Sequence, residues 1–262
     1  MSSLEVLLSA MHLENEKYID GLNITGDAVV INQCDYESKN IINRGTQEIK
    51  YICTKDRGLS KSRNMAISNA TSDICILCDN DVVYHEGYEK KILSAFEKHK
   101  DADIIVFYIK RKEKPVPNFP KEKRMGYLSV LKIFSPEIAF RKESISDISF
   151  DERFGAGSGK YIMGEENIFL YDALKKKKKI YYMPVEIAEL KEVESTWFSD
   201  YDETFFISRG ANYAAMTKCF APLLCLQFAI RKKELYKKNM TTLQALKYMR
   251  NGRREYSKLK EA

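Results

Sequence analysis

Short apolar runs alternate with amphipathic stretches along the first part of the chain. The runs rich in β-branched residues predict strands at Val6–Ala10, Ala28–Gln33, Ile49–Thr54, Ile74–Cys78 and Ile104–Ile109. Apolar residues recur at helical spacing in Leu59–Asn69 and Tyr88–Lys98. This alternation predicts an α/β fold in which helices cover both faces of a mostly parallel sheet. Such sheets bind ligands at the carboxyl ends of their strands.

The pattern changes after Ile109. Three prolines among many charged residues predict a loop over Lys110–Lys123. Next we expect a strand near Ser129–Phe134, a short helix around Pro136–Glu143, a helix from about Glu165 to Lys175, and a strand at Ile180–Met183 that Pro184 ends. From Thr217 onward the spacing is helical. We therefore expect one domain over residues 1–215, with halves at 1–110 and 124–215, and a helical extension over residues 216–262.

The charge of the chain is concentrated in this extension. The whole chain of 262 residues carries +6, whereas the eleven basic and three acidic residues of Arg231–Ala262 give +8, which leaves −2 elsewhere. The apolar stretch Cys219–Ile230 is interrupted by Pro222 and is shorter than the roughly 20 residues that span a bilayer. The N-terminus has no basic segment before its apolar residues, so we expect no signal peptide and a cytoplasmic protein.

Six cysteines occur without the dense spacing of a disulfide framework, which favours a reducing compartment. Cys75 and Cys78 form a CxxC pair inside a predicted buried strand, where residues three apart point to opposite faces. No second CxxC exists, so we interpret the pair as structural rather than as a zinc site.

The triplet Asp79-Asn80-Asp81 follows the fourth predicted strand. Two carboxylates placed where a buried strand reaches solvent can share a divalent cation and a ribose or diphosphate. Mg²⁺ or Mn²⁺ bound there would neutralise charge that develops on a departing nucleotide diphosphate. The alternative is an ordinary turn, because Asp and Asn favour turns.

A second polar block, Gly58 to Arg63, opens the first predicted helix. Gly58 permits a tight turn, Ser60 is expected to cap the helix N-terminus, and Arg63 would project from its first turns. Such a helix start suits an anion. The alternative for Arg63 is a salt bridge on the helix surface.

The order of these blocks resembles the family-2 glycosyltransferases. The segment Arg57–Ile67, then Ala70, an apolar strand and Asp79-Asn80-Asp81, occurs in the order and at the distances of that family. The resemblance covers roughly Leu4 to Gly210. It implies an inverting enzyme with a GT-A fold, of the type that builds bacterial capsular or cell-surface polysaccharides. It also implies that residues 1–110 bind a nucleotide sugar, with Arg63 near the nucleotide, and that residues 124–215 bind the acceptor.

The end of the second predicted strand carries Asn32, Gln33 and Asp35, where the family usually has an Asp pair that recognises uracil. An amide can offer both a donor and an acceptor to a base edge. The resemblance therefore implies donor binding here, with UDP as the expected nucleotide and the base identity open.

Gly164-Glu165-Glu166 resembles the acceptor motif of inverting GT-A enzymes, with Glu166 where the family has Asp. Inversion needs a carboxylate that takes the proton of the acceptor hydroxyl, and we assign this role to Glu166. Glu165 would hold a hydroxyl group, and Gly164 would border the acceptor. The alternative is that both acids only complement the helix N-terminus. We expect Glu166 and Asp81 to face each other across one cleft.

The segment Glu194-Ser195-Thr196-Trp197 matches a Ser-Thr-Trp motif of many family-2 enzymes. Trp197 would stack on the acceptor sugar or belong to the core. Relatives often place a metal-binding His shortly before this motif, where Lys191 stands here. A charged Lys cannot bind a metal ion but can stabilise a diphosphate, so dependence on Mn²⁺ or Mg²⁺ stays open.

The leading hypothesis is transfer of a hexose or N-acetylhexosamine from a UDP-sugar to a glycan or lipid-linked acceptor. The basic extension would hold the enzyme at anionic lipids on the inner face of a membrane, or would instead stabilise the domain or a dimer. A nucleotidyltransferase would carry a Gly-rich loop where Ala10–Glu14 stands, and a non-catalytic sugar-nucleotide-binding protein is a further alternative. The acidic balance of residues 1–230 argues against nucleic acid as a partner.

Overall fold

The computed structural model describes residues 2–191 and 200–261, which fall into two compact units. The first unit comprises the described residues of Met1–Arg57, Lys61–Ser149 and Leu170–Val193, and the second those of Gly58–Ser60, Phe150–Phe169 and Glu194–Ala262. The bounds of these two units are defined by contacts within the fold and do not test the domain and halves predicted above, which stay a prediction.

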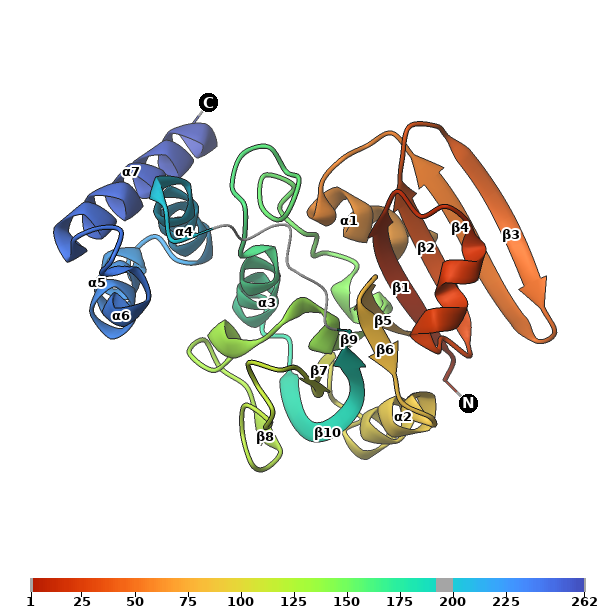
Figure 1. Cartoon of the computed structure of the whole chain (residues 1–262). Coiled ribbons are helices and arrows are strands. Elements are labelled where there is room, and N and C mark those ends of the chain that lie inside the picture. Colours follow the sequence, from red (N-terminus) through yellow and green to blue (C-terminus); the bar gives the residue numbers. More distant parts are fainter. Residues whose placement is uncertain (1, 192–199, 262) are drawn as a thin grey trace. The chain divides into compact units, whose positions relative to one another are not determined.

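A single mixed sheet organises the first unit (Figure 1). Its strands are β1 (Leu4–Met11), β2 (Asp27–Gln33), β3 (Ser38–Arg44), β4 (Gln47–Thr54), β5 (Ile74–Asp79), β6 (Val82–Tyr84), β7 (Ile104–Lys110), β8 (Lys123–Arg124), β9 (Ile138–Arg141) and β10 (Ile180–Leu190). Within the described residues the order is β3-β4-β2-β1-β5-β9-β7-β10-β6, and β8 pairs with β10. Strands β4, β2, β1 and β5 are parallel, as are β7 and β10. The predicted mostly parallel α/β fold is confirmed.

The helices are of two kinds. The α-helices are α1 (Leu59–Asn69), α2 (Tyr88–Lys98), α3 (Glu165–Lys175), α4 (Glu203–Met216), α5 (Ala221–Arg231), α6 (Lys233–Tyr236) and α7 (Thr242–Glu261). Short 3₁₀ helices are η1 (Glu16–Leu22), η2 (Val130–Lys132), η3 (Ser135–Glu137) and η4 (Glu143–Ile145). Helices α1, α2 and α3 have the bounds that the sequence predicted.

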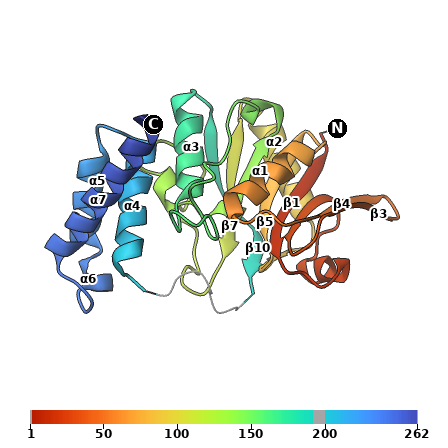
Figure 2. The ribbon, with the colours of Figure 1, turned by 90° about the horizontal axis from the view of Figure 1, so that it is seen from above.

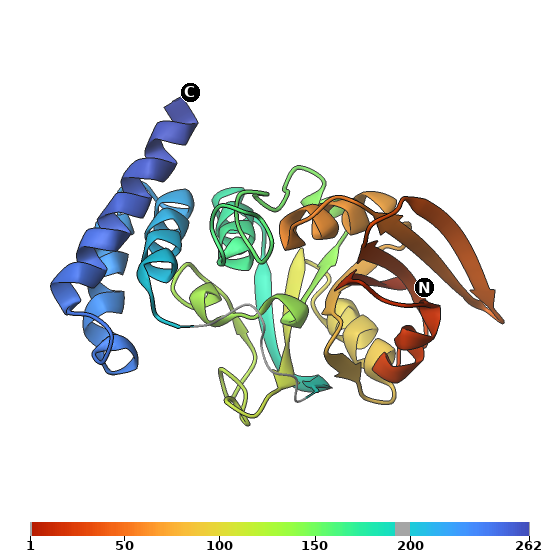
Figure 3. The ribbon, with the colours of Figure 1, turned by 45° about the horizontal axis from the view of Figure 1, so that its top comes forward.

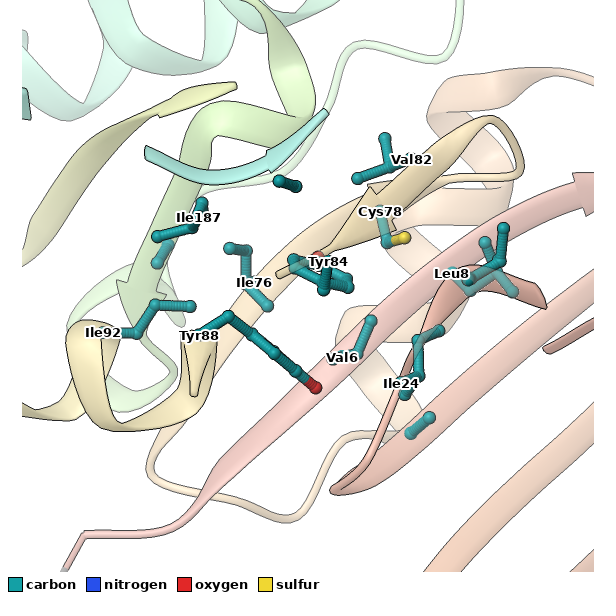
Figure 4. Close-up of a cluster of buried hydrophobic side chains, with 14 of the residues drawn as sticks. Val6, Leu8, Ile24, Ile76, Cys78, Val82, Tyr84, Tyr88, Ile92 and Ile187 are labelled. Carbon is teal, nitrogen blue, oxygen red and sulfur yellow. The ribbon is translucent and has the colours of Figure 1, made fainter. Parts of the chain in front are cut away.

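Side-chain alternation along β1 separates the two faces of the sheet. Val6 and Leu8 are buried with Tyr88 and other residues of α2 in one apolar cluster (Figure 4). Ser9 points to the opposite face, where the Ser62 hydroxyl of α1 donates to the Ser9 hydroxyl at 2.9 Å. Helices α1 and α2 therefore cover opposite faces of the sheet, and burial of this cluster is a main source of the unit's stability.

Two sequence predictions after residue 128 are wrong. The segment near Ser129–Phe134 is not a strand, because the Ser129 hydroxyl bonds to the backbone of Gly126 and favours the 3₁₀ turn η2. The predicted helix around Pro136–Glu143 is instead the turn η3 and strand β9. Strand β9 pairs with β5 and β7 and is buried between them, so tertiary pairing overrides the local pattern.

The prediction that Pro184 ends the last strand is wrong. Strand β10 continues to Leu190, and its register against β7 shifts between Tyr182 and Glu186. A proline removes one donor from the ladder, and an irregularity of this kind accommodates it. The sequence also failed to predict β3, whose exposed polar residues form the edge of the sheet. In contrast, Cys75 and Cys78 are buried in strand β5, as expected.

The second unit is built around helices α4, α5 and α7, which pack side by side in the views of Figures 2 and 3. Helix α7 buries Ala245, Met249, Gly252 and Tyr256, which recur every three or four residues. The predicted helical character of the extension is confirmed by α5, α6 and α7, and α7 is amphipathic. None of the helices in the described part of the chain is both long enough and apolar enough to cross a bilayer.

Two glycines set how closely α4 and α7 approach. A Cβ atom at Gly210 would lie 2.0 Å from the carbonyl oxygen of Met249. Reciprocally, a Cβ atom at Gly252 would lie 1.9 Å from the carbonyl oxygen of Ile207. The two backbones are therefore in direct contact, and no larger residue fits at either position without separating the helices.

Gly252→Ala is expected to destabilise the protein by about 1–3 kcal/mol, because the methyl group overpacks this contact. A loss of stability would be diagnostic of the close helix contact, because alanine normally stabilises a helix relative to glycine. Thermal unfolding would measure it. Gly126→Ala is the matched control, because nothing lies within 4 Å of a Cβ atom there. An unchanged melting temperature for Gly252→Ala would contradict the close packing.

Candidate functional site

A buried ion pair fixes the first carboxylate of the Asp79-Asn80-Asp81 triplet. Strand β5 ends at Asp79, and Nη2 of Arg63 on α1 donates to Asp79 Oδ1 at 3.0 Å. The Arg63 side chain is only 1% exposed, so the alternative of a salt bridge on the helix surface is wrong. The pair positions Asp79 at the carboxyl end of the sheet. Contact of either residue with a nucleotide stays a prediction.

Asp81 is held in a different electrostatic environment. Its Oδ1 atom is buried and accepts no hydrogen bond from any described residue. Burial, with a smaller contribution from the Asp79 carboxylate, raises the pKa of the Asp81 carboxyl to about 6. A buried carboxylate oxygen beside a second carboxylate gains most from a bound cation.

Three further contacts gather around the same triplet. The Tyr18 hydroxyl, on η1, donates to the Asn80 carbonyl at 2.9 Å. The Lys191 backbone N–H donates to the Asp81 carbonyl at 2.8 Å, and the Lys191 ammonium lies 5.5 Å from the centre of the Tyr18 ring. The structure thus brings Lys191 to the acidic triplet. Sequence reasoning missed Tyr18, because η1 is a short 3₁₀ helix with no strong pattern.

Asp79 and Asp81 are the carboxylates expected to bind the divalent cation that the resemblance implies. Among the described residues, no group of three or more His, Cys, Asp or Glu side chains could hold a metal ion. Mg²⁺, however, commonly binds one or two carboxylates and takes its other ligands from phosphates and water. Asp79 and Asp81, with the unpartnered Asp81 oxygen, fit a cation of that kind. Metal binding itself stays a prediction.

Asn32, expected to read a base edge, is engaged by the protein. Its Oδ1 accepts from the Leu13 backbone N–H at 2.9 Å. Its Nδ2 donates to the Leu13 carbonyl at 3.0 Å and to the Tyr51 hydroxyl at 3.2 Å. The amide therefore uses both its donor and its acceptor to hold the loop after β1. Contact of Asn32 with a base stays a prediction, and these hydrogen bonds within the protein do not favour that contact.

Gln33 and Asp35 lie at the end of β2 in contrasting settings. Gln33 is buried, whereas the Asp35 side chain is 85% exposed and accepts from Arg57 Nη2 at 2.8 Å. Arg57 Nη1 also donates to the carbonyls of Cys34 and Lys55, at 2.9 and 2.8 Å. Arg57 therefore ties the ends of β2 and β4 together, a role that the sequence analysis did not assign.

A pocket of about 420 Å³ opens beside these strand ends. It is lined by the loop at residues 14–16, by Tyr36 and by residues of β3 and β4, among them Tyr51. Tyr36 is 53% exposed, and the Tyr51 hydroxyl accepts the bond from Asn32. An aromatic wall with polar groups at its edge is suited to a planar, hydrogen-bonding ring.

Glu165 and Glu166 begin α3 in the second unit. Glu165 is 5% exposed, and Glu166 is half-buried. Gly155, with φ of +100°, allows the Glu165 carboxyl close by, because a Cβ atom at that glycine would lie 3.2 Å from it. The two acids thus differ in access to solvent, and Glu166 is the more accessible. The expectation that Glu166 faces Asp81 across a cleft stays a prediction.

The backbone before α3 requires glycine at position 164. Gly164 has φ of +91°, and a Cβ atom there would lie 2.3 Å from Asn212 Nδ2. The Asn212 amide, on α4, donates to the Gly164 carbonyl at 2.8 Å. Buried Asn212 therefore fixes the entry into α3. No local signal marked Asn212, which lies far away in the sequence.

Ser60 does not cap α1, contrary to the prediction. The helix already begins at Leu59, and the Ser60 hydroxyl donates to the Phe154 carbonyl at 2.7 Å. The Leu59 N–H also donates to the Ala156 carbonyl at 2.9 Å. Gly58, with φ of +117°, passes close to the backbone of Gly157. These residues therefore secure the loop that precedes the candidate base, and their predicted donor contacts stay untested.

Helix α7 supports the same loop from another side. Arg153 Nη2 donates to the Tyr256 hydroxyl at 3.1 Å and lies 2.6 Å from Asp151 Oδ2. The Phe154 ring packs at 5.7 Å from the Tyr256 ring. One face of the basic extension is therefore a structural support, as one of its two interpretations proposed. Trp197 and the segment 194–196 lie outside the described residues.

Comparison with known proteins gives one family and one fold. The sequence profile described as "Glycosyl transferase family 2" matches residues 28–159, half of the chain. No curated protein matches the chain.

Solved structures of S. aureus TarS are similar to the chain. The crystal structure of TarS 1–349 with UDP-GlcNAc is 14% identical with a TM-score of 0.64, covering 98% of this chain and 90% of that one. The complex of TarS 1–349 with UDP is 14% identical with a TM-score of 0.61, covering 90% and 73%. Another TarS structure is 15% identical with a TM-score of 0.61, covering 90% of this chain and 44% of that one. At these identities the likeness shows the fold.

Proposed function

Since the chain belongs to glycosyl transferase family 2 and is a glycosyltransferase with a GT-A fold, we propose that it moves a sugar from a UDP-sugar to a hydroxyl group of a glycan or lipid-linked acceptor, with inversion. The observation that carries the donor assignment is the cluster of Arg63, Asp79, Asp81 and Lys191 at the carboxyl end of β5. Its place in the sheet is where ligands of parallel α/β sheets bind. The S. aureus TarS structures, which bind UDP and UDP-GlcNAc, support UDP as the nucleotide.

Within the proposed donor site, different residues would bind different parts of the nucleotide. The pocket beside Tyr36 and Tyr51 would take the base, and the acidic triplet would take the ribose and diphosphate. Asp79 and Asp81 would hold Mn²⁺ or Mg²⁺, which supplies positive charge to the departing diphosphate. The Lys191 ammonium near the triplet would add a second positive charge. Arg63 acts by positioning Asp79, since it is buried against it.

The acceptor half of the reaction would depend on the start of α3. Glu166 takes the proton of the acceptor hydroxyl while that oxygen attacks the anomeric carbon, and the bond from that carbon to the diphosphate breaks. The more buried Glu165 would hold a hydroxyl group of the acceptor or donor. Glu166 is supported as the base by its greater exposure, because a base must reach an incoming alcohol.

The acceptor is proposed to belong to a surface polysaccharide under construction, and the enzyme to work in the cytoplasm at the inner face of the membrane. The support is the charge of the C-terminal extension, +8 over Arg231–Ala262. Basic helices are attracted to anionic lipids by about 1 kcal/mol for each Lys or Arg near the surface.

A panel of nucleotide sugars tests this function directly. Binding and hydrolysis of UDP-, GDP-, dTDP- and CMP-sugars would be measured with and without Mn²⁺. We expect a UDP-sugar to bind at least about tenfold more tightly than the others, because the base pocket and diphosphate site act together. Preference for another nucleotide would refute UDP, and no binding of any nucleotide sugar would refute the donor site.

A further inference from the structure

A basic groove lies between α5 and α7 in the second unit. Its volume is about 640 Å³, and its walls are Pro222 and Cys225 of α5 together with residues of α7. The α7 side contributes Leu246, Arg250, Arg253, Arg254, Ser257 and Lys258. Four of these side chains are cationic and none of the described lining residues is acidic. The groove therefore offers several donors to an anion such as a phosphate group.

An exposed apolar row runs along α5, the helix that also supplies Pro222 and Cys225 to the groove, and begins at Phe220, directly before this helix. Phe220, Leu223, Leu226 and Ile230 recur every three or four residues and are 64, 62, 44 and 62% exposed. The buried residues of the same helix, among them Leu224 and Ala229, lie on its other face. Within the described part of the chain, helix α5 thus exposes an apolar face to solvent, and the same helix forms one wall of a groove lined by cations. Neither feature serves the donor or acceptor chemistry proposed above.

Charge complementarity selects the occupant of this surface. A second copy that presented the same surface would bring a second set of cations toward the first, which is unfavourable at close range. An anionic bilayer instead offers phosphate groups to the cations and acyl chains to the apolar row. Surface-bound amphipathic helices combine these two contacts. Pro222 and Cys225, which line the groove, lie on the same helix as Leu223, Leu226 and Ile230 of the row.

We propose that the groove and the apolar row of α5 together bind the surface of an anionic membrane, with lipid phosphate groups in the groove and the row inserted among the acyl chains. The inference rests on the proposed function only in placing this surface at the inner face of the membrane. It assigns different roles to two faces of the extension. Ala245, Met249 and Tyr256 pack inside the unit, and the groove side of α7 binds lipid.

Vesicle flotation with the full chain tests the proposal. The vesicles are phosphatidylcholine alone, or phosphatidylcholine mixed with phosphatidylglycerol. We expect binding to the mixed vesicles only, and a loss of at least about tenfold in the double variant Arg250→Glu/Arg254→Glu. The double variant Leu223→Glu/Ile230→Glu should lose binding to a similar extent, because it places charge on the inserted row.

Lys232→Glu/Lys238→Glu is the matched control, since it makes the same charge change at exposed residues that do not line the groove. Equal loss of binding in this control would overturn the groove as the site. The Leu223→Glu/Ile230→Glu protein could instead bind vesicles normally and be a monomer where the wild type is a dimer. That result would overturn the proposal for the row and assign the row to contact with a second copy. UDP-sugar binding without vesicles, measured for every variant, separates failure of this proposal from failure of the donor site.

Discussion

Glutamine in place of Glu166 is expected to lower sugar transfer by about 10³-fold, the contribution of a well-placed general base. The substitution keeps the length and hydrogen-bonding capacity of the side chain but removes the negative charge that takes the proton. UDP-sugar binding should stay within about twofold, because the assigned contact of Glu166 is with the acceptor. The measurements are initial rates of transfer at saturating donor and calorimetric titration of the donor.

Two companion variants make this result specific. Glu152→Gln removes an exposed carboxylate of the same unit and should leave transfer unchanged. Glu165→Gln should raise the KM for the acceptor more than it lowers kcat, because Glu165 is assigned to hold a hydroxyl group. If Glu166→Gln retains transfer activity and Glu165→Gln loses it, the general base is the buried Glu165 and not Glu166.

The elements that the sequence predicted are those whose signal is local. Strand β5 is an unbroken apolar run, and α1 and α2 carry their period within a few turns, so their bounds needed no knowledge of the fold. Strand β9 could not be found in this way. Its identity as a strand depends on β5 and β7, which lie far from it in the sequence and bury it from both sides.

The candidate site divides along the same line. Asp79, Asp81 and Glu166 are acidic residues within motifs, so the sequence alone indicated a functional role for all three. The residues that position such groups carry no comparable signal in the sequence. The sequence predicts a ligand contact for the Arg63 guanidinium, and the structure shows this group donating to Asp79. Asn212 reaches Gly164 across 48 residues and carries no motif. Support of this kind depends on tertiary packing, which local patterns do not encode.

The assigned roles also explain why Asp81 is kept in an unfavourable setting. A carboxylate that is buried beside another carboxylate is costly while no cation is bound, and binding sites often carry such a cost in exchange for ligand affinity. Asp79, in contrast, is neutralised by Arg63 within the protein. In the proposed site the two acids of the triplet therefore differ: Asp79 is already paired with Arg63, and Asp81 is the carboxylate proposed to gain from a bound cation.

Asp81→Asn is accordingly expected to change activity and stability in opposite directions. Transfer in the presence of Mn²⁺ should fall by about 10²-fold, equal to about 3 kcal/mol, because the side chain loses the charge that holds the cation. Metal-free protein should instead become more stable at pH 7. The folded-state pKa of Asp81, about 6, lies above the ordinary value of 3.8, so folding favours the protonated form.

The pH dependence of this stability follows from the direction of the shift. The contribution of Asp81 is fully present below about pH 4 and is lost as the pH rises through about 6. The variant has no such loss, so its advantage over the wild type should be near zero at pH 4 and about 1 kcal/mol at pH 7, after allowance for solvent screening. Urea unfolding with a chelator at both pH values measures it. An advantage equal at the two pH values, or reversed at pH 7, would show that Asp81 is not the buried, unneutralised carboxylate described above.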